Sequence, residues 1–253
     1  MNNHNNKNVS EKVYPESLPE SLTKQARIFI GGSPRGKCLL DIPLTPSRPL
    51  PSIKQNLPAE GIRMIWGGEP TLRPDLPELI AALSNQSEVW MRTDGLALDA
   101  SVLEQLKSRG LSGVMIFLYS FRSDANDWLM GIDGATRRII RRIRQLIEKF
   151  PLAIEIILTR STAPHLDETV NALFRLGVRR IHVRRPVAEG AFATDFIALS
   201  PRIGQIRPFL LQATHSAKKV SAVITFEGVP FCSVPPIGDR IVSADSIAYH
   251  GYE

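Results

Sequence analysis

The sequence predicts an α/β fold, a partial (β/α)6 barrel with a short C-terminal extension, and three observations support this prediction. Six short apolar runs recur along the chain, as expected for strands that are buried on both faces of a parallel sheet. The runs are Ile28 to Ile30, Ile62 to Trp66, Val89 to Met91, Val114 to Leu118, Ile154 to Leu158 and Ile181 to Val183. Segments with helical spacing separate most of them, which indicates parallel strands joined by helices. Polar residues or glycines follow the runs, at the sheet edge where such folds bind ligands.

Helical periodicity and turn residues indicate where the connecting helices begin and end. In one segment Ile139, Ile143 and Leu146 fall on a single helical face. Gly110 and Gly177 follow helical segments, where a residue in the left-handed conformation would end a helix. These features support helices between the predicted strands.

The chain divides into three predicted parts. Residues 1–25 are polar and Asn-rich, which indicates a disordered or arm-like leader. Residues 26–200 form the predicted barrel core, and residues 201–253 form a helix, an added strand at Val220 to Phe226 and a tail that wraps the core. The stretch from Leu39 to Pro58 interrupts the pattern, because its prolines disrupt helices.

Composition limits the classes of function. The chain has 253 residues, 43% of them apolar, and no apolar run approaches the roughly 20 residues of a membrane span. Its two cysteines, Cys38 and Cys232, are far apart and offer no disulfide framework, so we expect a cytoplasmic protein. The net charge of +6 is compatible with an anionic partner such as a peptide or nucleotide.

Polar residues at the predicted strand ends form a candidate binding site. Glycines there let a backbone approach a ligand, and arginines can hold a carboxylate or phosphate through two hydrogen bonds. The turn after the second strand, Gly67-Gly68-Glu69-Pro70, followed by Thr71 and Leu72, resembles a signature of the radical S-adenosylmethionine (radical SAM) superfamily, especially its peptide-modifying members. Thr93-Asp94-Gly95 and Tyr119-Ser120-Phe121 are similar to the family's third and fourth strand ends.

The resemblance implies a site for S-adenosylmethionine (SAM) or a related nucleoside. In the family the four-residue turn contacts the amino group of SAM largely through backbone carbonyls, and the resemblance puts Ser120 near the SAM carboxylate or ribose. The residues that we expect to bind this cofactor are Gly67, Gly68, Glu69, Pro70, Thr93, Asp94, Ser120, Arg160 and Arg184.

The cluster motif of the family is absent. Radical SAM enzymes hold an iron–sulfur cluster with three cysteines spaced C-x3-C-x2-C after the first strand, and this region of the chain contains only Cys38. Whichever of the three positions Cys38 takes, glycine, proline or isoleucine occupies one of the others. We therefore expect neither a four-iron, four-sulfur cluster nor another metal site, and radical chemistry is not expected.

A phosphate-binding loop is an alternative for the region around Cys38. Gly31 to Cys38 fits G-x-x-x-x-G-K, with cysteine in place of the serine or threonine that binds magnesium, and no helix is predicted after it. The residues that would hold an anion are Gly31, Gly32, Arg35, Gly36 and Lys37. The other interpretation is a solvated basic loop.

Three further groups of polar residues have more than one interpretation. Arg137, Arg138, Arg141 and Arg142 crowd one helix, either as a solvated face or as a contact for an acidic partner; without aromatic residues among them, nucleic acid is not expected. His182 lies in the sixth strand and faces either the barrel interior or the outer helices. Glu155 would be a buried carboxylate if it faced inward.

These observations leave three hypotheses for the function. The leading one is a cluster-less radical SAM-fold protein, a pseudoenzyme that acts as a binding or partner subunit in maturation of a peptide or specialised metabolite. Its partners would be an intact radical SAM enzyme, a peptide substrate, or both. The alternatives are an enzyme that uses SAM or a related nucleoside for non-radical chemistry, and a nucleotide-binding protein that uses the loop from Gly31 to Cys38.

Overall fold

The computed structural model describes residues 25–29, 62–85, 87–186, 188, 192–242 and 247–250, with the side chains of 25–29, 192–194 and 247–250 left aside. Residues 1–24 of the predicted leader, the whole proline-rich stretch and the predicted anion-binding loop with Cys38 lie outside these residues. None of the described helices is long and apolar enough to cross a bilayer.

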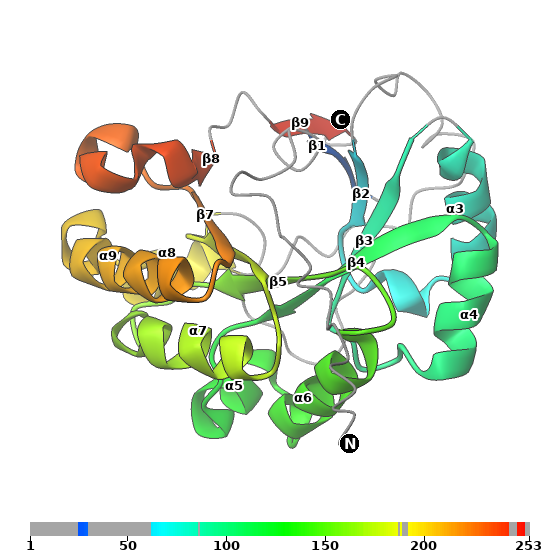
Figure 1. Cartoon of the computed structure of the whole chain (residues 1–253), viewed down its shortest axis with the longest axis horizontal. Helices are drawn as coiled ribbons and strands as arrows, with labels where there is room; N and C mark the ends of the chain where they lie inside the picture. Colours follow the sequence, from blue (N-terminus) through cyan, green and yellow to red (C-terminus); the bar gives the residue numbers. More distant parts are fainter. Residues whose placement is uncertain are drawn as a thin grey trace, which may run out of the picture.

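The described strands form one curved sheet of nine strands in the order β8-β7-β6-β5-β4-β3-β2-β1-β9, and every neighbouring pair is parallel. Figure 1 shows the sheet curling into an open barrel with helices around its outside. The strands are β1 Gln25–Phe29, β2 Ile62–Trp66, β3 Val89–Thr93, β4 Leu111–Leu118, β5 Leu152–Ile157, β6 Arg180–Arg184, β7 Val223–Glu227, β8 Ile241–Val242 and β9 Ile247–His250. The expected partial α/β barrel is thus confirmed.

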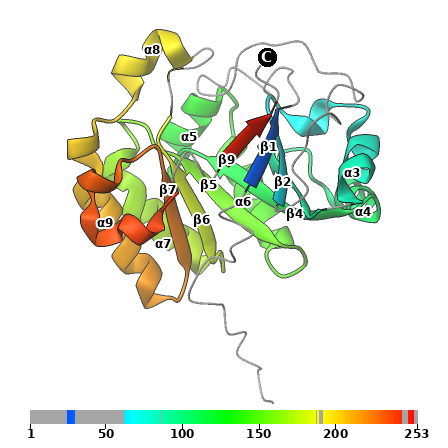
Figure 2. The same ribbon diagram turned by 90° about the horizontal axis from the view of Figure 1, so that it is seen from above.

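Helices follow the strands and cover the convex face of the sheet. They are α3 Leu76–Ser84, α4 Ala100–Ser108, α5 Ser123–Met130, α6 Ala135–Leu146, α7 Leu166–Arg175, α8 Phe192–Leu199 and α9 Ile203–Lys219, with short 3-10 turns at Pro70–Leu72, Ala163–His165, Phe231–Ser233 and Pro235–Arg240. Figure 2 shows α8 apart from the layer that α7 and α9 form. A large apolar core lies between the sheet and these helices.

The two faces of the sheet differ in composition. Burial of apolar side chains against α3 to α7 stabilises the outer layer, and Ile139, Ile143 and Leu146 of α6 are part of it. The concave face carries a smaller apolar group, which consists of Ile62, Met64, Trp90, Met115 and Ala153. Most charged residues within the strands share this inner face.

All six predicted strands are present, with boundaries within about four residues of the apolar runs. The added strand is β7, which begins at Val223 rather than Val220 because α9 ends only at Lys219. β7 and β8 extend the sheet beyond β6, while β9 pairs with β1 at the opposite edge. The C-terminal segment therefore contributes strands to both edges of the same sheet.

The predicted helix ends agree with the backbone conformation at two glycines. Gly110 and Gly177 have φ of 99° and 96°, a region that side-chain-bearing residues rarely adopt. At the start of α3 the N-cap residue is Asp75, whose side chain makes no capping hydrogen bond and instead accepts two hydrogen bonds from Arg73.

Candidate functional site

The turn after β2 lies at the carboxyl edge of the sheet and depends on its two glycines. Gly67 has a φ of 104° and Gly68 a φ of 55°, so a side chain at either position would strain the backbone. The chain then enters a short 3-10 turn from Pro70 to Leu72, capped by the side chain of Glu69. No described donor reaches the carbonyl oxygen of Gly67 or Gly68.

The carboxylate of Glu69 is buried, and it joins the end of β2 to the end of β3. Its Oε1 accepts hydrogen bonds from the hydroxyl groups of Thr71 and Thr93, both at 2.6 Å, and from the Thr71 amide at 3.2 Å. Its Oε2 accepts one from the Asp94 amide at 2.7 Å. Four protein donors therefore surround this carboxylate, so its contribution to a site is to hold the turn in place.

The environment of Glu69 raises its pKa to about 7. Burial is the main cause, and repulsion from the Asp94 carboxylate adds to it, whereas the hydrogen bonds from Asp94, Thr71 and Thr93 act in the opposite direction. The group therefore titrates near neutral pH in the folded protein.

Thr93 and Asp94 complete this end of the sheet. The Thr93 hydroxyl donates to Glu69 and accepts a hydrogen bond from the Gly95 amide at 3.1 Å. One carboxylate oxygen of Asp94 accepts from the Leu96 amide at 2.7 Å, which fixes the turn into the next segment. Gly67, Gly68, Glu69, Pro70, Thr93 and Asp94 thus form one connected group, as predicted from the strand ends.

Ser120, at the end of β4, is buried and its hydroxyl is used within the protein. It accepts a hydrogen bond from the Arg122 amide at 3.1 Å and lies 3.5 Å from the Thr169 hydroxyl of α7. Beside it the buried Asn126 accepts from the Tyr119 amide at 2.8 Å and donates to Thr136 at 2.9 Å. These bonds tie the end of β4 to α5, α6 and α7.

Arg160, after β5, is exposed and caps a helix. Its Nη2 donates to the carbonyl of Ile197 at 2.6 Å and to that of Ser200 at 3.5 Å, while its backbone amide bonds to the Leu199 carbonyl. A guanidinium at this end of α8 also complements the negative end of the helix dipole. The structure thus does not bring Arg160 into the group around Glu69.

Arg184 belongs to a buried ionic cluster on the inner face of the sheet. Glu155 of β5 accepts a hydrogen bond from Nε of Arg92 at 2.6 Å, and its other oxygen lies 3.3 Å from Nε of Arg184. The second contact is ionic attraction rather than an aligned hydrogen bond. The Arg92 guanidinium also lies over the Phe117 ring at 4.2 Å. Glu155 therefore faces inward, between two cations.

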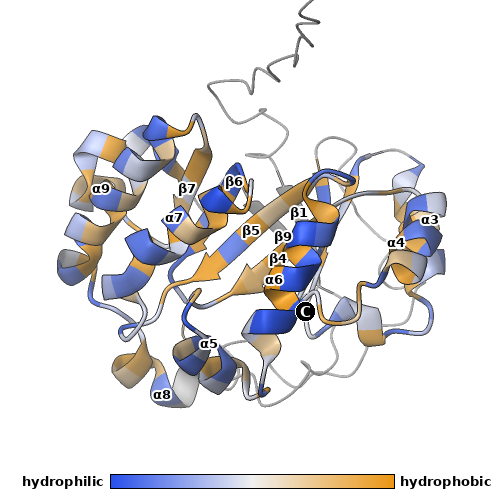
Figure 3. Cartoon of the chain, turned by 60° about the horizontal axis from the view of Figure 1, so that its bottom comes forward, coloured by the Kyte–Doolittle hydropathy of each residue, from blue (hydrophilic) through white to orange (hydrophobic). Residues whose placement is uncertain are grey.

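His182 also faces the inner side of the sheet, which settles the direction that the sequence left open. Its Nε2 lies 2.8 Å from Glu227 and its Nδ1 lies 2.9 Å from the Thr225 hydroxyl, both on β7. Register places Glu155 directly beside His182. Figure 3 shows a hydrophilic segment within the otherwise apolar strand β5.

The contribution of Arg92 and Glu227 to this inner cluster was not predicted from the sequence. A signal existed, because each is a charged residue within or at the end of an apolar strand, and register places Glu227 beside Arg184. Only the curvature of the sheet, which brings β3, β5 and β6 together, reveals that the cluster is shared by several strands.

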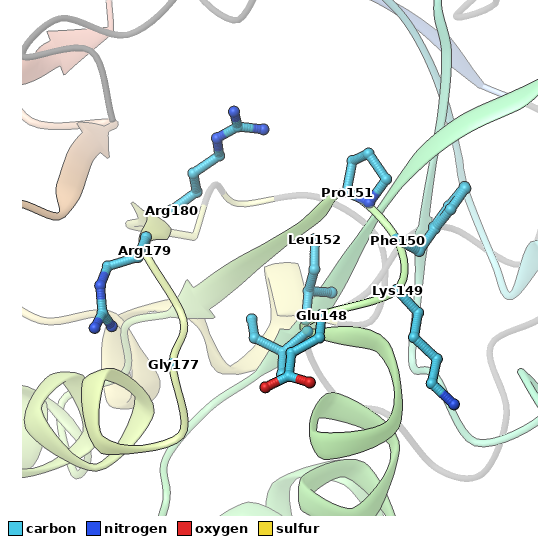
Figure 4. Close-up of a pocket in the computed structure, with 9 residues that line it drawn as sticks. Glu148, Lys149, Phe150, Pro151, Leu152, Gly177, Arg179 and Arg180 are labelled. Carbon is cyan, nitrogen blue, oxygen red and sulfur yellow. The ribbon is translucent and has the colours of Figure 1, made fainter. Parts of the chain in front are cut away.

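Two hollows lie away from the Glu69 turn. One, of about 300 Å³, lies at the amino ends of β5 and β6, and Figure 4 shows Arg179 and Arg180 pointing in different directions around it. Nη1 of Arg179 donates to the carbonyl of Phe174, in the last turn of α7, and to that of Val178, which follows the helix. The other, of about 490 Å³, lies along α6.

The residues present do not fit the cluster that radical SAM enzymes carry. Cys232 is exposed on a C-terminal 3-10 turn, and Cys38 stands alone in its segment of the sequence. Within the described part of the chain, no three histidine, cysteine or acidic side chains come together in a group that could hold a metal ion.

Comparison with curated proteins finds similarity to two groups of cyclases. A probable GTP 3',8-cyclase of Sulfurisphaera tokodaii is 33% identical over 129 residues, which is 49% of this chain and 41% of that protein. A PqqA peptide cyclase of Granulibacter bethesdensis is 24% identical over 165 residues, which is 64% of this chain and 44% of that protein. No family model matches the chain.

The solved structure of Streptococcus suis SuiB bound to its precursor peptide SuiA superimposes with a TM-score of 0.67. It is 19% identical and covers 85% of this chain and 51% of SuiB. The chain is thus similar in sequence to these cyclases over part of its length, and similar in fold to SuiB. It spans less than half the length of the curated relatives described above.

Proposed function

We propose that the chain is a cluster-less radical SAM-fold protein that acts as a binding or partner subunit in the maturation of a peptide or specialised metabolite. One observation carries the proposal: at the carboxyl edge of its sheet the chain has a turn, Gly67 to Pro70, that resembles the SAM-contacting turn of the family, yet it has two cysteines in all. In the family the turn contacts SAM, whereas the cysteines hold the iron–sulfur cluster at which the reaction starts.

The turn around Glu69 supports binding of SAM or a related nucleoside. The carbonyl oxygens of Gly67 and Gly68 accept no hydrogen bond from described residues, so they can accept one from an ammonium group. Glu69, Thr93 and Asp94 hold the turn rigid through their mutual hydrogen bonds. When bound, SAM supplies an activated methyl or adenosyl group, and the residues described here bind and orient it.

A peptide is the favoured partner because SuiB, the solved protein of similar fold, was crystallised with its precursor peptide and also with SAM. An intact radical SAM enzyme would then perform the reaction beside this chain.

Calorimetric titration with SAM, S-adenosylhomocysteine and ATP tests the binding part of the proposal. We expect SAM to bind, and Gly68→Ala to weaken binding about tenfold or more, because a methyl group at a positive φ strains the turn. Gly134→Ala is the matched control, since Gly134 also has a positive φ, of 71°, but precedes α6. ATP binding without SAM binding would favour the nucleotide-binding alternative at Gly31 to Cys38.

Anaerobic reconstitution with iron and sulfide tests whether the chain alone holds an iron–sulfur cluster, which the proposed partner role excludes. We expect no stoichiometric iron–sulfur cluster in the chain alone, because three thiolates are needed and one is present in the relevant segment. A cluster that responds to SAM in electron paramagnetic resonance would overturn the proposal. Turnover of SAM by the chain alone, without a cluster, would favour the alternative of a non-radical enzyme.

A further inference from the structure

The groove along α6 has an unusual combination of charge and shape. It has a volume of about 490 Å³, and its lining residues are Phe121, Ser123, Thr136, Arg137, Ile140, Arg141, Arg144 and Gln145. Three arginines line it and no acidic residue does. It opens next to the carboxyl edge of the sheet, since Phe121 directly follows Ser120 at the end of β4.

The three arginines form one row on α6. Arg137, Arg141 and Arg144 are exposed and lie at positions i, i+4 and i+7, which share one side of a helix. Arg138 and Arg142 lie on another side of the helix, where Arg142 donates to Gln145 and is attracted by Asp99. Figure 3 shows alternating hydrophilic and apolar bands along the ribbon of α6.

Within the described part of the chain, the cations of this row have no opposite charge paired with them. Among the described residues, no ion pair includes Arg137, Arg141 or Arg144. Asp124, beside the opposite wall, is bonded through both oxygens to Arg122. A row of cations with no carboxylate beside it favours an anionic occupant.

We propose that this groove binds an extended acidic segment of the peptide partner, with acidic side chains two residues apart. Arg137 and Arg141 are separated by about 6 Å along the helix axis. Alternate residues of an extended peptide are separated by about 6.6 Å and point to one side, so successive acidic residues can each meet one arginine. The residues between them then face the opposite wall, where Phe121 supplies apolar surface.

A peptide fits this groove better than a nucleic acid. Single-stranded nucleic acids are held by aromatic side chains on which bases stack, and the groove offers one aromatic ring, which is half-buried. Its apolar floor at Ile140 suits an aliphatic side chain. The inference rests on the proposed function, since it takes the occupant to be part of the peptide that the barrel binds.

Fluorescence anisotropy with a labelled peptide of alternating glutamate and leucine tests the inference. We expect Arg137→Gln with Arg141→Gln to weaken binding about tenfold or more, and replacement of the glutamates by glutamine to do the same. The matched control is Arg109→Gln with Arg138→Gln, which removes the same charge from exposed positions outside the groove and should change affinity less than about twofold.

Three outcomes would overturn the inference. They are an equal loss in both double variants, no loss in either, or tighter binding of an oligothymidine through the same arginines. Circular dichroism of each variant confirms that it is folded. The SAM titration is an independent measurement: its failure would count against the proposed function, whereas the anisotropy result decides the groove.

Discussion

Two buried carboxylates in this barrel are held in opposite ways. Glu155 lies between Arg92 and Arg184 within the sheet, and Glu69 lies beside Asp94 at the edge of the sheet, surrounded by neutral donors. Both side chains are less than 5% exposed. The first is neutralised by cations, and the second is raised in pKa to about 7.

The difference shows which buried carboxylate is held by ionic contacts and which one changes protonation near neutral pH. Two guanidinium groups fix the charge of Glu155, so the middle of the sheet is held by ionic contacts that are costly to break. At Glu69, burial favours the protonated carboxyl group and the hydrogen bonds favour the carboxylate. The stability of the turn that we propose as a SAM site therefore depends on pH. The four predictions that follow test this contrast.

The largest effect is expected for Glu155→Ala. The substitution leaves two buried guanidinium groups without their shared carboxylate, and we expect the free energy of unfolding to fall by about 3–5 kcal/mol. Urea unfolding measures it. Glu155→Gln retains the shape and one acceptor and should cost less. A loss below about 1 kcal/mol for the alanine variant would contradict the ionic role of Glu155.

The second prediction concerns the pH dependence of stability. Since the folded-state pKa of Glu69 is about 7 and exceeds that of an unfolded glutamate, the folded protein holds a proton that the unfolded chain releases. This group therefore favours folding most below the unfolded pKa, and the stabilisation is lost as pH rises toward about 7, up to about 3 kcal/mol.

Glu69→Gln removes this ionisation, so the pH dependence of unfolding should become flatter than in the wild type between the two pKa values. Urea midpoints measured across that range give the comparison, and other titrating groups cancel in the difference between the two proteins. Parallel curves for the wild type and the variant would show that Glu69 does not titrate there.

A smaller effect is expected for Thr93→Val. The valine removes one hydrogen-bond donor to Glu69 and keeps the side-chain shape, which should cost about 1–2 kcal/mol. Because that bond favours the ionised carboxylate, the loss should be larger above the pKa of Glu69 than below it. Thr71→Val, which removes the other hydroxyl donor, should lose stability with the same pH dependence; losses independent of pH in both variants would contradict this assignment.

The smallest effect is expected for an exposed carboxylate. Glu104 pairs with Lys107 at 2.9 Å, but its side chain is 69% exposed, so solvent screens the attraction. Glu104→Ala should change the free energy of unfolding by less than about 0.5 kcal/mol in thermal or urea unfolding. A cost comparable with that of Glu155→Ala would show that burial does not explain the contrast.

Much of the fold could be read from local patterns. Ile62 to Trp66 was predicted as a strand with the boundaries that β2 has, because its apolar run is bounded by glycine. The later strand was misplaced by three residues at its start, since Val220 and Ser221 lack the sharp turn signal that would have separated α9 from β7. The pairing of β9 with β1 had no local signal at all.

The candidate site was predictable in part. Gly67 to Pro70, Thr93 and Asp94 do meet, because parallel strand ends lie at the same edge of a sheet. Arg160 and Arg184 also follow or end strands, yet one caps α8 and the other joins Glu155. Position along the chain does not reveal which way a long flexible side chain turns.

The amino-acid sequence by itself determined the alternation of strands and helices, the glycine turn after β2 and the lack of a cysteine trio, because each depends on neighbouring residues only. The tertiary structure alone decided that Glu155 and His182 face inward, that Arg92 and Arg184 share one carboxylate, and that three arginines of α6 line a groove beside Phe121. These features depend on sheet curvature and on packing between elements distant in the chain, which no local pattern specifies.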